Sequence, residues 1–388
     1  MTTKFKSFEY RLYPTADQIK TLVGWQDSLR FLWNIANEQY FLNRNRIKEN
    51  RVKVNFYTQD KELTQLRKEL PWLNEVPRHL CTSILLNLSD AWNRYFSLVS
   101  GKPKFKRKSQ CMSLKEFDWD PYCRGRQEVI FPKLGKISAI IHRPFYGIPK
   151  SCTIKNDGDQ WFAYITCKIE DEPKLNRKTT SSVGLDRGIR NILADSNSRV
   201  VVNPRFLKAK QKKITRLQRK LARKTKHSSN WNKAKNQLAR TYRKTRRQRK
   251  HFLHVESNNY AKNHSVVVIE NLPVQSMCNG NWAKGIMDSG WGIFARMLKY
   301  KLEDSGGTLL KVAAQNSSQT CSCCSHVDKN SRCGEQFSCT KCGHQDHADV
   351  NAAKIILSRM NHSVQPVDGD LKRQTGRSRK LKNTKPCV

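Results

Sequence analysis

The feature that most constrains this chain is a pair of Cys-x-x-Cys motifs near its C-terminal end. Cys321 and Cys324 form the first motif, Cys339 and Cys342 form the second, and fourteen residues separate the two. Four thiolates in two tight turns can close a tetrahedral shell around one zinc ion, and this spacing is typical of zinc ribbons. We therefore expect a structural zinc over residues 317–343, with free thiols in a Cys-rich chain as the less favoured interpretation.

Charge is the second constraint. Lysine and arginine number 73 against 32 aspartates and glutamates in 388 residues, which gives a net charge of +41. Such a surface repels itself unless a polyanion neutralises it, so nucleic acid is the expected partner. A membrane is the competing polyanion, but no run of eighteen apolar residues and no signal-peptide core appears. We expect no membrane partner, no disulfide framework, and the cytosol of a prokaryote-like cell, or a nucleus in a eukaryote.

The first 109 residues predict a strand followed by helices. Residues 4–14 alternate like a strand, and Thr15 to Gln18 has the form of a capping box that starts a long helix. Further helices are expected over about 57–70 and after Pro77. At helical spacing, the first helix carries apolar residues that we expect in the core, Leu22, Leu29, Leu32, Trp33, Ala36 and Tyr40. The helix after Pro77 carries Leu80, Ile84, Leu85, Leu88, Trp92 and Phe96. The segment GKPKFKRK, residues 101–108, has too many charges for a core and is interpreted as a phosphate-contacting loop.

Beyond the loop, the apolar residues recur at every second position, as in strands. Strands are expected over 137–141, 151–155 and 161–169, with Asp157-Gly158 as the hairpin turn between the last two. A polar linker over 174–181 then indicates a domain boundary.

The second half alternates apolar strands with helices. The segment from Ser182 reads as a strand up to Asp186 and turns into a hairpin partner over 191–194. Residues 205–250 hold twenty lysines or arginines and no acid, and we expect two basic helices packed as a hairpin with a face open to phosphates. A strand ending at Glu270, a helix over 290–306 and the strand LLKVAA complete this part.

Three acids carry the expected chemistry. Asp186 and Glu270 each end an apolar strand, and Asp349 opens a segment that reads as a helix. Either strand acid alone is more often a capping or ion-pairing residue, but three acids from distant segments suit Mg²⁺ or Mn²⁺. Two such ions about 4 Å apart can activate water and stabilise the leaving oxygen in phosphodiester cleavage.

Several motifs resemble those of TnpB proteins, RNA-guided nucleases of bacterial insertion sequences that are similar to ancestors of type V CRISPR effectors. The segments VGLDRG, VVIENL, SSQTCSCC, CTKCGH and ADVNAAK occur in the order typical of that family. RLYPT, GKPKFKRK, RKHFLH and GWGIFARMLKYK also resemble family stretches, so the resemblance covers nearly the whole chain.

The resemblance implies an α/β fold: an RNase H-like RuvC nuclease domain with an inserted zinc ribbon, preceded by a β-barrel wedge domain with a helical recognition insertion. The expected wedge covers residues 1–14 and 110–180, and the helical insertion covers 15–109. The expected nuclease domain covers 181–316 and 344–358, the ribbon 317–343, and a basic, disordered tail 359–388. It further implies Asp186, Glu270 and Asp349 as the catalytic Mg²⁺ ligands, and Cys321, Cys324, Cys339 and Cys342 as the zinc ligands.

The implied partners are a guide RNA from the end of the element and double-stranded target DNA, cut beside a short flanking motif by a single RuvC site. A monomer associated with the nucleoid is expected. Two ligand alternatives stay open: Cys323 could replace one of the four cysteines, and Asp346, three residues before Asp349 and hence on a similar helical face, could replace the third acid. The competing functions are a transposase, a guide-directed DNA-binding repressor without cleavage, and a zinc-ribbon RNA-binding protein.

Overall fold

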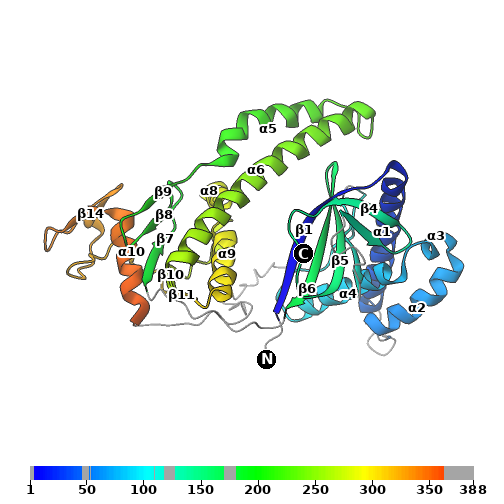
Figure 1. Cartoon of the computed structure of the whole chain (residues 1–388), viewed down its shortest axis with the longest axis horizontal. Helices are drawn as coiled ribbons and strands as arrows, with labels where there is room; N and C mark the ends of the chain where they lie inside the picture. Colours follow the sequence, from blue (N-terminus) through cyan, green and yellow to red (C-terminus); the bar gives the residue numbers. More distant parts are fainter. Residues whose placement is uncertain are drawn as a thin grey trace, which may run out of the picture. The chain divides into compact units, whose positions relative to one another are not determined.

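The computed structural model describes residues 4–45, 52, 54–108, 110–117, 127–169 and 181–361. The chain forms two compact units: the described residues up to 169 belong to the first and those from 181 to the second (Figure 1).

The first unit is built on a six-stranded antiparallel sheet in the order β2-β5-β6-β1-β4-β3. Its strands are β1 (Lys4–Tyr13), β2 (Leu114–Phe117), β3 (Glu128–Phe131), β4 (Gly135–Ile140), β5 (Ile148–Asp157) and β6 (Gln160–Ile169). The N-terminal strand β1 pairs with both β6 and β4, so the chain's first strand lies inside a sheet completed after the helices. The expected β-unit with a helical insertion is confirmed, although β2 and β3 were not predicted.

The helices of this unit are α1 (Ala16–Asn45), α2 (Phe56–Glu69), α3 (Pro71–Asn74) and α4 (Arg78–Phe96). The capping box at the start of α1 is confirmed, because Thr15 and Gln18 exchange backbone-to-side-chain hydrogen bonds of 3.0 and 3.3 Å. The predicted apolar stripes of α1 and α4 are buried in one core with the sheet, except for Phe96. Phe96 is the last residue of α4 and is 57% exposed.

The second unit contains a five-stranded sheet in the order β11-β10-β7-β8-β9. Its strands are β7 (Ser182–Asp186), β8 (Asn191–Asp195), β9 (Val200–Val202), β10 (Val266–Glu270) and β11 (Thr308–Val312). An antiparallel meander, β7 to β9, is followed by β10 and β11, which run parallel to β7. This order and these directions are those of an RNase H-like sheet, so the expected fold class is confirmed.

Helices cover both faces of that sheet. They are α5 (Phe206–Ala222), α6 (Ser229–Asn263), α7 (Val274–Met277), α8 (Ala283–Ser289), α9 (Trp291–Asp304) and α10 (Ala348–Ser358). Apolar residues of α6 and α9 share a core with Val267 and Ile269 of β10, whereas Ile356 of α10 packs on Val268. Since successive strand residues face opposite sides, α10 lies on the other face from α6 and α9, as Figure 1 shows. The basic helices α5 and α6 form the expected hairpin.

Between β11 and α10 the chain forms a small three-stranded sheet, β12 (Arg332–Cys333), β13 (Gln336–Ser338) and β14 (Gln345–His347). No helix of the described part of the chain has the length and apolarity needed to cross a bilayer. Residues 359–361 form a short 3-10 turn, while the expected linker over 174–180 and the expected tail from 362 lie outside the described residues.

Candidate active site

The register of two parallel strands brings Asp186 and Glu270 to the same edge of the sheet. Leu185 of β7 pairs with Ile269 of β10. Asp186 directly follows Leu185 and Glu270 directly follows Ile269, so the two acids lie side by side on neighbouring strands. Because side chains alternate along a strand, both acids lie on the face that Val268 shares with α10. The two acids that the sequence placed at strand ends are therefore neighbours in the fold.

Helix α10 brings the third acid to this edge. Its first turn carries Asp349, and its middle packs on β7 at Gly184, where a Cβ atom would lie 2.2 Å from the carbonyl oxygen of Ala353. Only glycine allows this approach of helix to strand without a shift of the backbone. The small residue Ala353 is fully buried at this contact. The motif ADVNAAK thus positions Asp349 by close helix packing.

The carboxyl group of Asp186 interacts electrostatically with those of Glu270 and Asp349. The pKa of Asp186 is raised to about 7, first by burial, then by the carboxylates of Glu270 and Asp349, while Arg332 partly offsets the rise. Glu270 and Asp349 are themselves only 7% and 9% exposed. Clustered, buried carboxylates of this kind repel one another unless cations neutralise them, and their oxygens are the donors that Mg²⁺ and Mn²⁺ prefer. The residues present fit a divalent-metal site.

Three neighbours hold the carboxylates in place and a fourth holds the backbone of Glu270, and none of the four was predicted. Arg332 donates to Asp349 Oδ1 at 2.7 Å, Asn191 donates to Asp349 Oδ2 at 3.0 Å, and Ser317 donates to Glu270 Oε1. Arg187, 6% exposed, donates to the carbonyl oxygen of Glu270. Burial lowers the pKa of the Arg187 guanidinium, and the acidic neighbours Glu270 and Asp186 counteract that effect.

The alternative third acid, Asp346, occupies a different position from the one expected. Helix α10 begins at Ala348, and Asp346 lies before it on strand β14, so the premise of a shared helical face was wrong. Its carboxylate accepts a hydrogen bond from Lys354 Nζ at 2.8 Å. The acids that raise the pKa of Asp186 are Glu270 and Asp349.

The four predicted cysteines gather into one cluster. The Sγ atoms of Cys321, Cys324, Cys339 and Cys342 all lie within 4.8 Å of one another. Cys321 and Cys342 are 3.7 Å apart, and Cys324 and Cys339 are 3.6 Å apart. A Zn–S distance of about 2.3 Å in a tetrahedron gives S–S edges of about 3.8 Å, so the cluster fits one zinc ion. Exposed Cys323 is outside this set.

Two equivalent turns present these thiols. Cys321 N–H donates to His326 O and Ser325 N–H donates to Cys321 O. The second turn makes the same two bonds: Cys339 N–H donates to His344 O, and Gly343 N–H donates to Cys339 O. Ser325 and Gly343 both have positive φ, 60° and 69°, as the shared geometry requires.

Asn351 joins the cysteine cluster to the acids. Its side chain is fully buried and accepts from Ser322 N–H at 2.9 Å while donating to Thr320 O at 2.7 Å, on both sides of Cys321. Asn351 lies on α10 only two residues after Asp349. The first cysteine turn and the third acid are therefore held by one helical turn.

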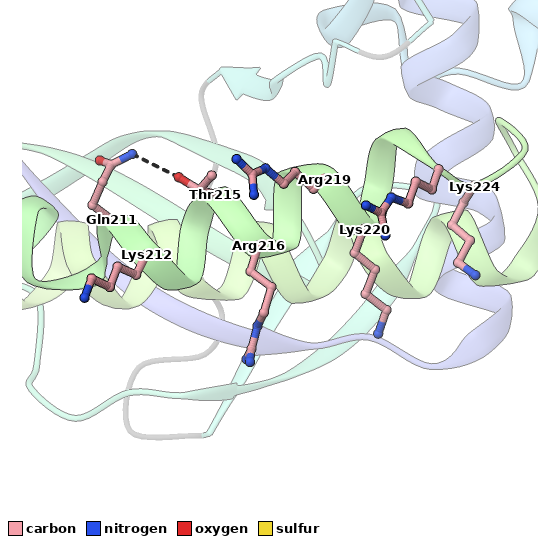
Figure 2. Close-up of a pocket in the computed structure, with 8 residues that line it drawn as sticks. Gln211, Lys212, Thr215, Arg216, Arg219, Lys220 and Lys224 are labelled. Carbon is pink, nitrogen blue, oxygen red and sulfur yellow. Dashed lines mark hydrogen bonds between the residues drawn. The ribbon is translucent and has the colours of Figure 1, made fainter.

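A hollow runs along the basic helix α5 and the turn that follows it. It is lined by Gln211, Lys212, Thr215, Arg216, Arg219, Lys220, Arg223 and Lys224. Figure 2 shows the labelled side chains from Gln211 to Lys220 on α5 and that of Lys224 just after it, with Gln211 bonded to Thr215. Six of the eight lining residues are cations, which is the composition expected of a surface that binds phosphates.

Three family profiles match this chain. One described as "Probable transposase" (OrfB_IS605) covers residues 164–280, and one described as "Cas12f1-like, TNB domain" covers 291–356, which includes the cysteine cluster. A third, "Helix-turn-helix domain" (HTH_OrfB_IS605), covers 1–44. Within the described residues that third region forms strand β1 and the 30-residue helix α1, rather than two helices joined by a turn.

The chain is also similar to curated proteins over most of its length. It is 28% identical over 382 residues to "Putative RNA-guided DNA endonuclease InsQ" of Escherichia coli (strain K12), covering 93% of each chain. A "Putative RNA-guided DNA endonuclease" of Streptomyces pristinaespiralis is 28% identical, covering 91% of this chain and 89% of the relative. A 58-residue stretch is 41% identical to "CRISPR-associated endodeoxyribonuclease Cas12f1" of Sulfoacidibacillus thermotolerans, covering 15% and 14% of the two chains.

Proposed function

We propose that this chain is an RNA-guided, divalent-metal-dependent DNA endonuclease of a transposable element, a proposal supported by the OrfB_IS605 profiles that match residues 1–44 and 164–280. Two of the relatives named above carry the words RNA-guided DNA endonuclease in their names. The observation that carries the proposal is the convergence of Asp186, Glu270 and Asp349 at one edge of an RNase H-like sheet.

In this proposal the three carboxylates hold Mg²⁺ or Mn²⁺. When bound, such ions would supply activation of the attacking water and stabilisation of the leaving oxygen of a phosphodiester. The chain's own residues prepare the site. Asp186, whose pKa is raised to about 7, would release its proton to solvent on binding the ion, and Arg187 holds the backbone of Glu270. Arg332 forms a 2.7 Å ion pair with Asp349.

The second cofactor in the proposal is zinc on Cys321, Cys324, Cys339 and Cys342. It has a structural role, because the four thiols complete a tetrahedral shell and leave no position for a substrate. The partners are a guide RNA and double-stranded DNA, whose phosphates the cationic face of α5 suits. The guide pairs with the target, and the protein reads a short flanking motif beside it. We propose a monomer that acts in the cytoplasm, associated with the nucleoid.

Cleavage of a plasmid tests the proposal. The chain is purified with its associated RNA and mixed with a plasmid that carries the matched target and flank. We expect Mg²⁺-dependent double-strand breaks, and we expect Asp186→Ala to abolish them while RNA binding is retained. Asp349→Asn should also abolish cleavage, whereas Asp346→Asn should cut nearly as well as the wild type. Absence of Mg²⁺-dependent breaks with every co-purified guide would refute the endonuclease.

A transposase is the second candidate, favoured by the description of the profile that matches 164–280. Joining of DNA ends could use the same acids and the same metal ions. The two functions give different products, since a transposase yields strand-transfer joints and an endonuclease yields free ends. A repressor without cleavage would bind the target DNA and leave it uncut. A zinc-ribbon RNA-binding protein would not explain the three clustered acids.

A further inference from the structure

The basic loop of the first unit presents an exposed aromatic ring. Phe105 lies in the segment GKPKFKRK, has half of its surface open to solvent, and belongs to no buried core cluster. Its inner side stacks on Phe41 of α1, with ring centroids 5.6 Å apart and an angle of 22° between the planes. Phe41 in turn contacts the fully buried ring of Trp92 edge to face at 5.3 Å. One side of the exposed ring is therefore anchored to the core.

The backbone on both sides of this ring is fixed to α1. Asn34 makes two hydrogen bonds to Lys106, accepting from its N–H at 2.7 Å and donating to its carbonyl at 3.1 Å. Trp33 Nε1 donates to the carbonyl of Lys104 at 3.1 Å. Lys106 Nζ lies 4.6 Å from the centre of the Trp33 ring. Because the loop is held at residues 104 and 106, Phe105 is presented in one position before any ligand arrives, which lowers the entropic cost of binding.

Cations surround the ring. Lys102, Lys104, Arg107 and Lys108 are exposed, and no acid occurs in the sequence between Asp90 and Glu116. None of these four cations forms an ion pair with another residue of the described ranges. An exposed phenyl ring alone would attract any apolar partner. A phenyl ring among cations matches a nucleobase with its flanking phosphates, since the base stacks and the phosphates are neutralised.

We propose that Phe105 is a stacking platform for an unpaired nucleobase, with the surrounding lysines and arginine holding the adjacent phosphates. Both the guide RNA and a displaced DNA strand can supply such a base. The inference shares with the proposed function only its premise of a nucleic-acid partner, and its test needs no cleavage.

The test is a binding titration with the full chain, freed of co-purifying nucleic acid, in EDTA and about 0.3 M salt. High salt weakens phosphate contacts and leaves stacking almost unchanged. The probes are a mixed-sequence single strand of about 20 nucleotides as RNA and as DNA, and the corresponding blunt DNA duplex. The variants are Phe105→Ala, Phe105→Leu and Phe105→Trp. Tyr57→Ala is the matched control, because Tyr57 is 80% exposed on α2 and has no cation beside it in sequence.

We expect Phe105→Ala to weaken binding of at least one single strand by about 5- to 150-fold, which corresponds to about 1–3 kcal/mol for a stacked base. Phe105→Trp should bind as the wild type does, Phe105→Leu should bind almost as poorly as Phe105→Ala, and Tyr57→Ala should have no effect. The strand that responds identifies the source of the base. A response of both strands fits stacking, which is tolerant of sugar and sequence.

A series of abasic substitutions separates stacking from general contact. One abasic position should weaken binding to the wild type and have no effect on binding to Phe105→Ala. The proposal is overturned if Phe105→Ala binds both single strands like the wild type, if Phe105→Leu restores affinity, if only the duplex responds, or if no abasic position shows this coupling. Melting temperatures of all variants check that the first unit stays folded.

Discussion

The cysteine cluster and the acid cluster of the second unit are assembled in opposite ways. All four cysteines lie between residues 321 and 342, and each pair is formed by one turn with its own backbone hydrogen bonds. The acids come from residues 186, 270 and 349 and meet only because β7 and β10 pair in register and α10 packs on Gly184. A site of the first kind depends on local geometry, and a site of the second kind depends on the whole fold.

The two sites also differ in what supports them. The cysteine cluster has a small core of Cys321, Phe337, Cys339 and Ala348, with Cys324 beside it. The acids lie on a sheet with its own large core from α6 and α9. We therefore expect the ribbon to need its metal for folding, whereas the RNase H-like sheet should fold without one.

The largest effect should follow removal of zinc. Cys339→Ser, or a strong chelator, should unfold residues 317–347, because structural zinc contributes about 10–16 kcal/mol of apparent binding free energy in zinc fingers. Hydrogen exchange should increase there while β7 and β10 stay protected, and metal analysis should give one zinc per chain for the wild type. Cys323→Ser is the control and should keep the zinc. Equal protection of the ribbon with and without zinc would contradict the expectation that the ribbon needs its metal to fold and the sheet does not.

The next effect concerns pH. A carboxyl whose pKa is raised on folding stabilises the folded chain only in its protonated form, so its contribution is present below pH about 4 and is lost as pH rises through about 7. In EDTA, Asp186→Asn should therefore match the wild type near pH 4 and exceed its free energy of unfolding by up to about 4 kcal/mol at pH 8. Urea titrations at several pH values measure the difference. Saturating Mg²⁺ should reduce or reverse it, and a difference that does not change with pH would show that Asp186 ionises normally.

Gly184→Ala should break the packing that brings in the third acid. Its new Cβ would meet the backbone of Ala353 at 2.2 Å, so α10 has to move, at a cost of about 1–3 kcal/mol. Mg²⁺ affinity should fall as Asp349 moves, while zinc content should stay at one per chain. Gly292→Ala in α9 is the matched control, since nothing lies within 4 Å of its Cβ position and helix propensity favours alanine. Equal metal affinity in both variants would exclude α10 packing as the cause.

The smallest effect should come from Asn191→Ala. Loss of the hydrogen bond to Asp349 Oδ2 should weaken Mn²⁺ binding by about 10- to 100-fold, the usual range for residues that orient a metal ligand. Calorimetric titration of the uncomplexed chain with Mn²⁺ measures this directly. Arg190→Ala is the control: its side chain is 73% exposed and pairs with Glu335. Similar losses in the two variants would indicate general damage to the segment around the start of β8.

Sequence reasoning succeeded where a residue pattern carries its own geometry. The spacing of Cys321, Cys324, Cys339 and Cys342 defines two turns, and the apolar runs before Asp186 and Glu270 define two buried strands. Short strands such as β9, with three residues, were missed because so few residues show no period.

The neighbours of the acids could not be predicted. Arg332 reaches Asp349 from a two-residue strand of the ribbon, and nothing in its local sequence indicates that partner. Asn191 offered a weak signal, since it is a buried polar residue at the start of the apolar strand NILAD. Its partner became visible only with the placement of α10.

The two-residue step from Asp349 to Asn351 has a consequence for sequence variation. Each helical residue turns the side chain by about 100°, so these two point in well-separated directions from one turn. An insertion or deletion of a single residue between them would rotate one partner out of alignment with its neighbours. Substitutions can be accommodated there one at a time, but a change in length would uncouple the ribbon from the acids at once.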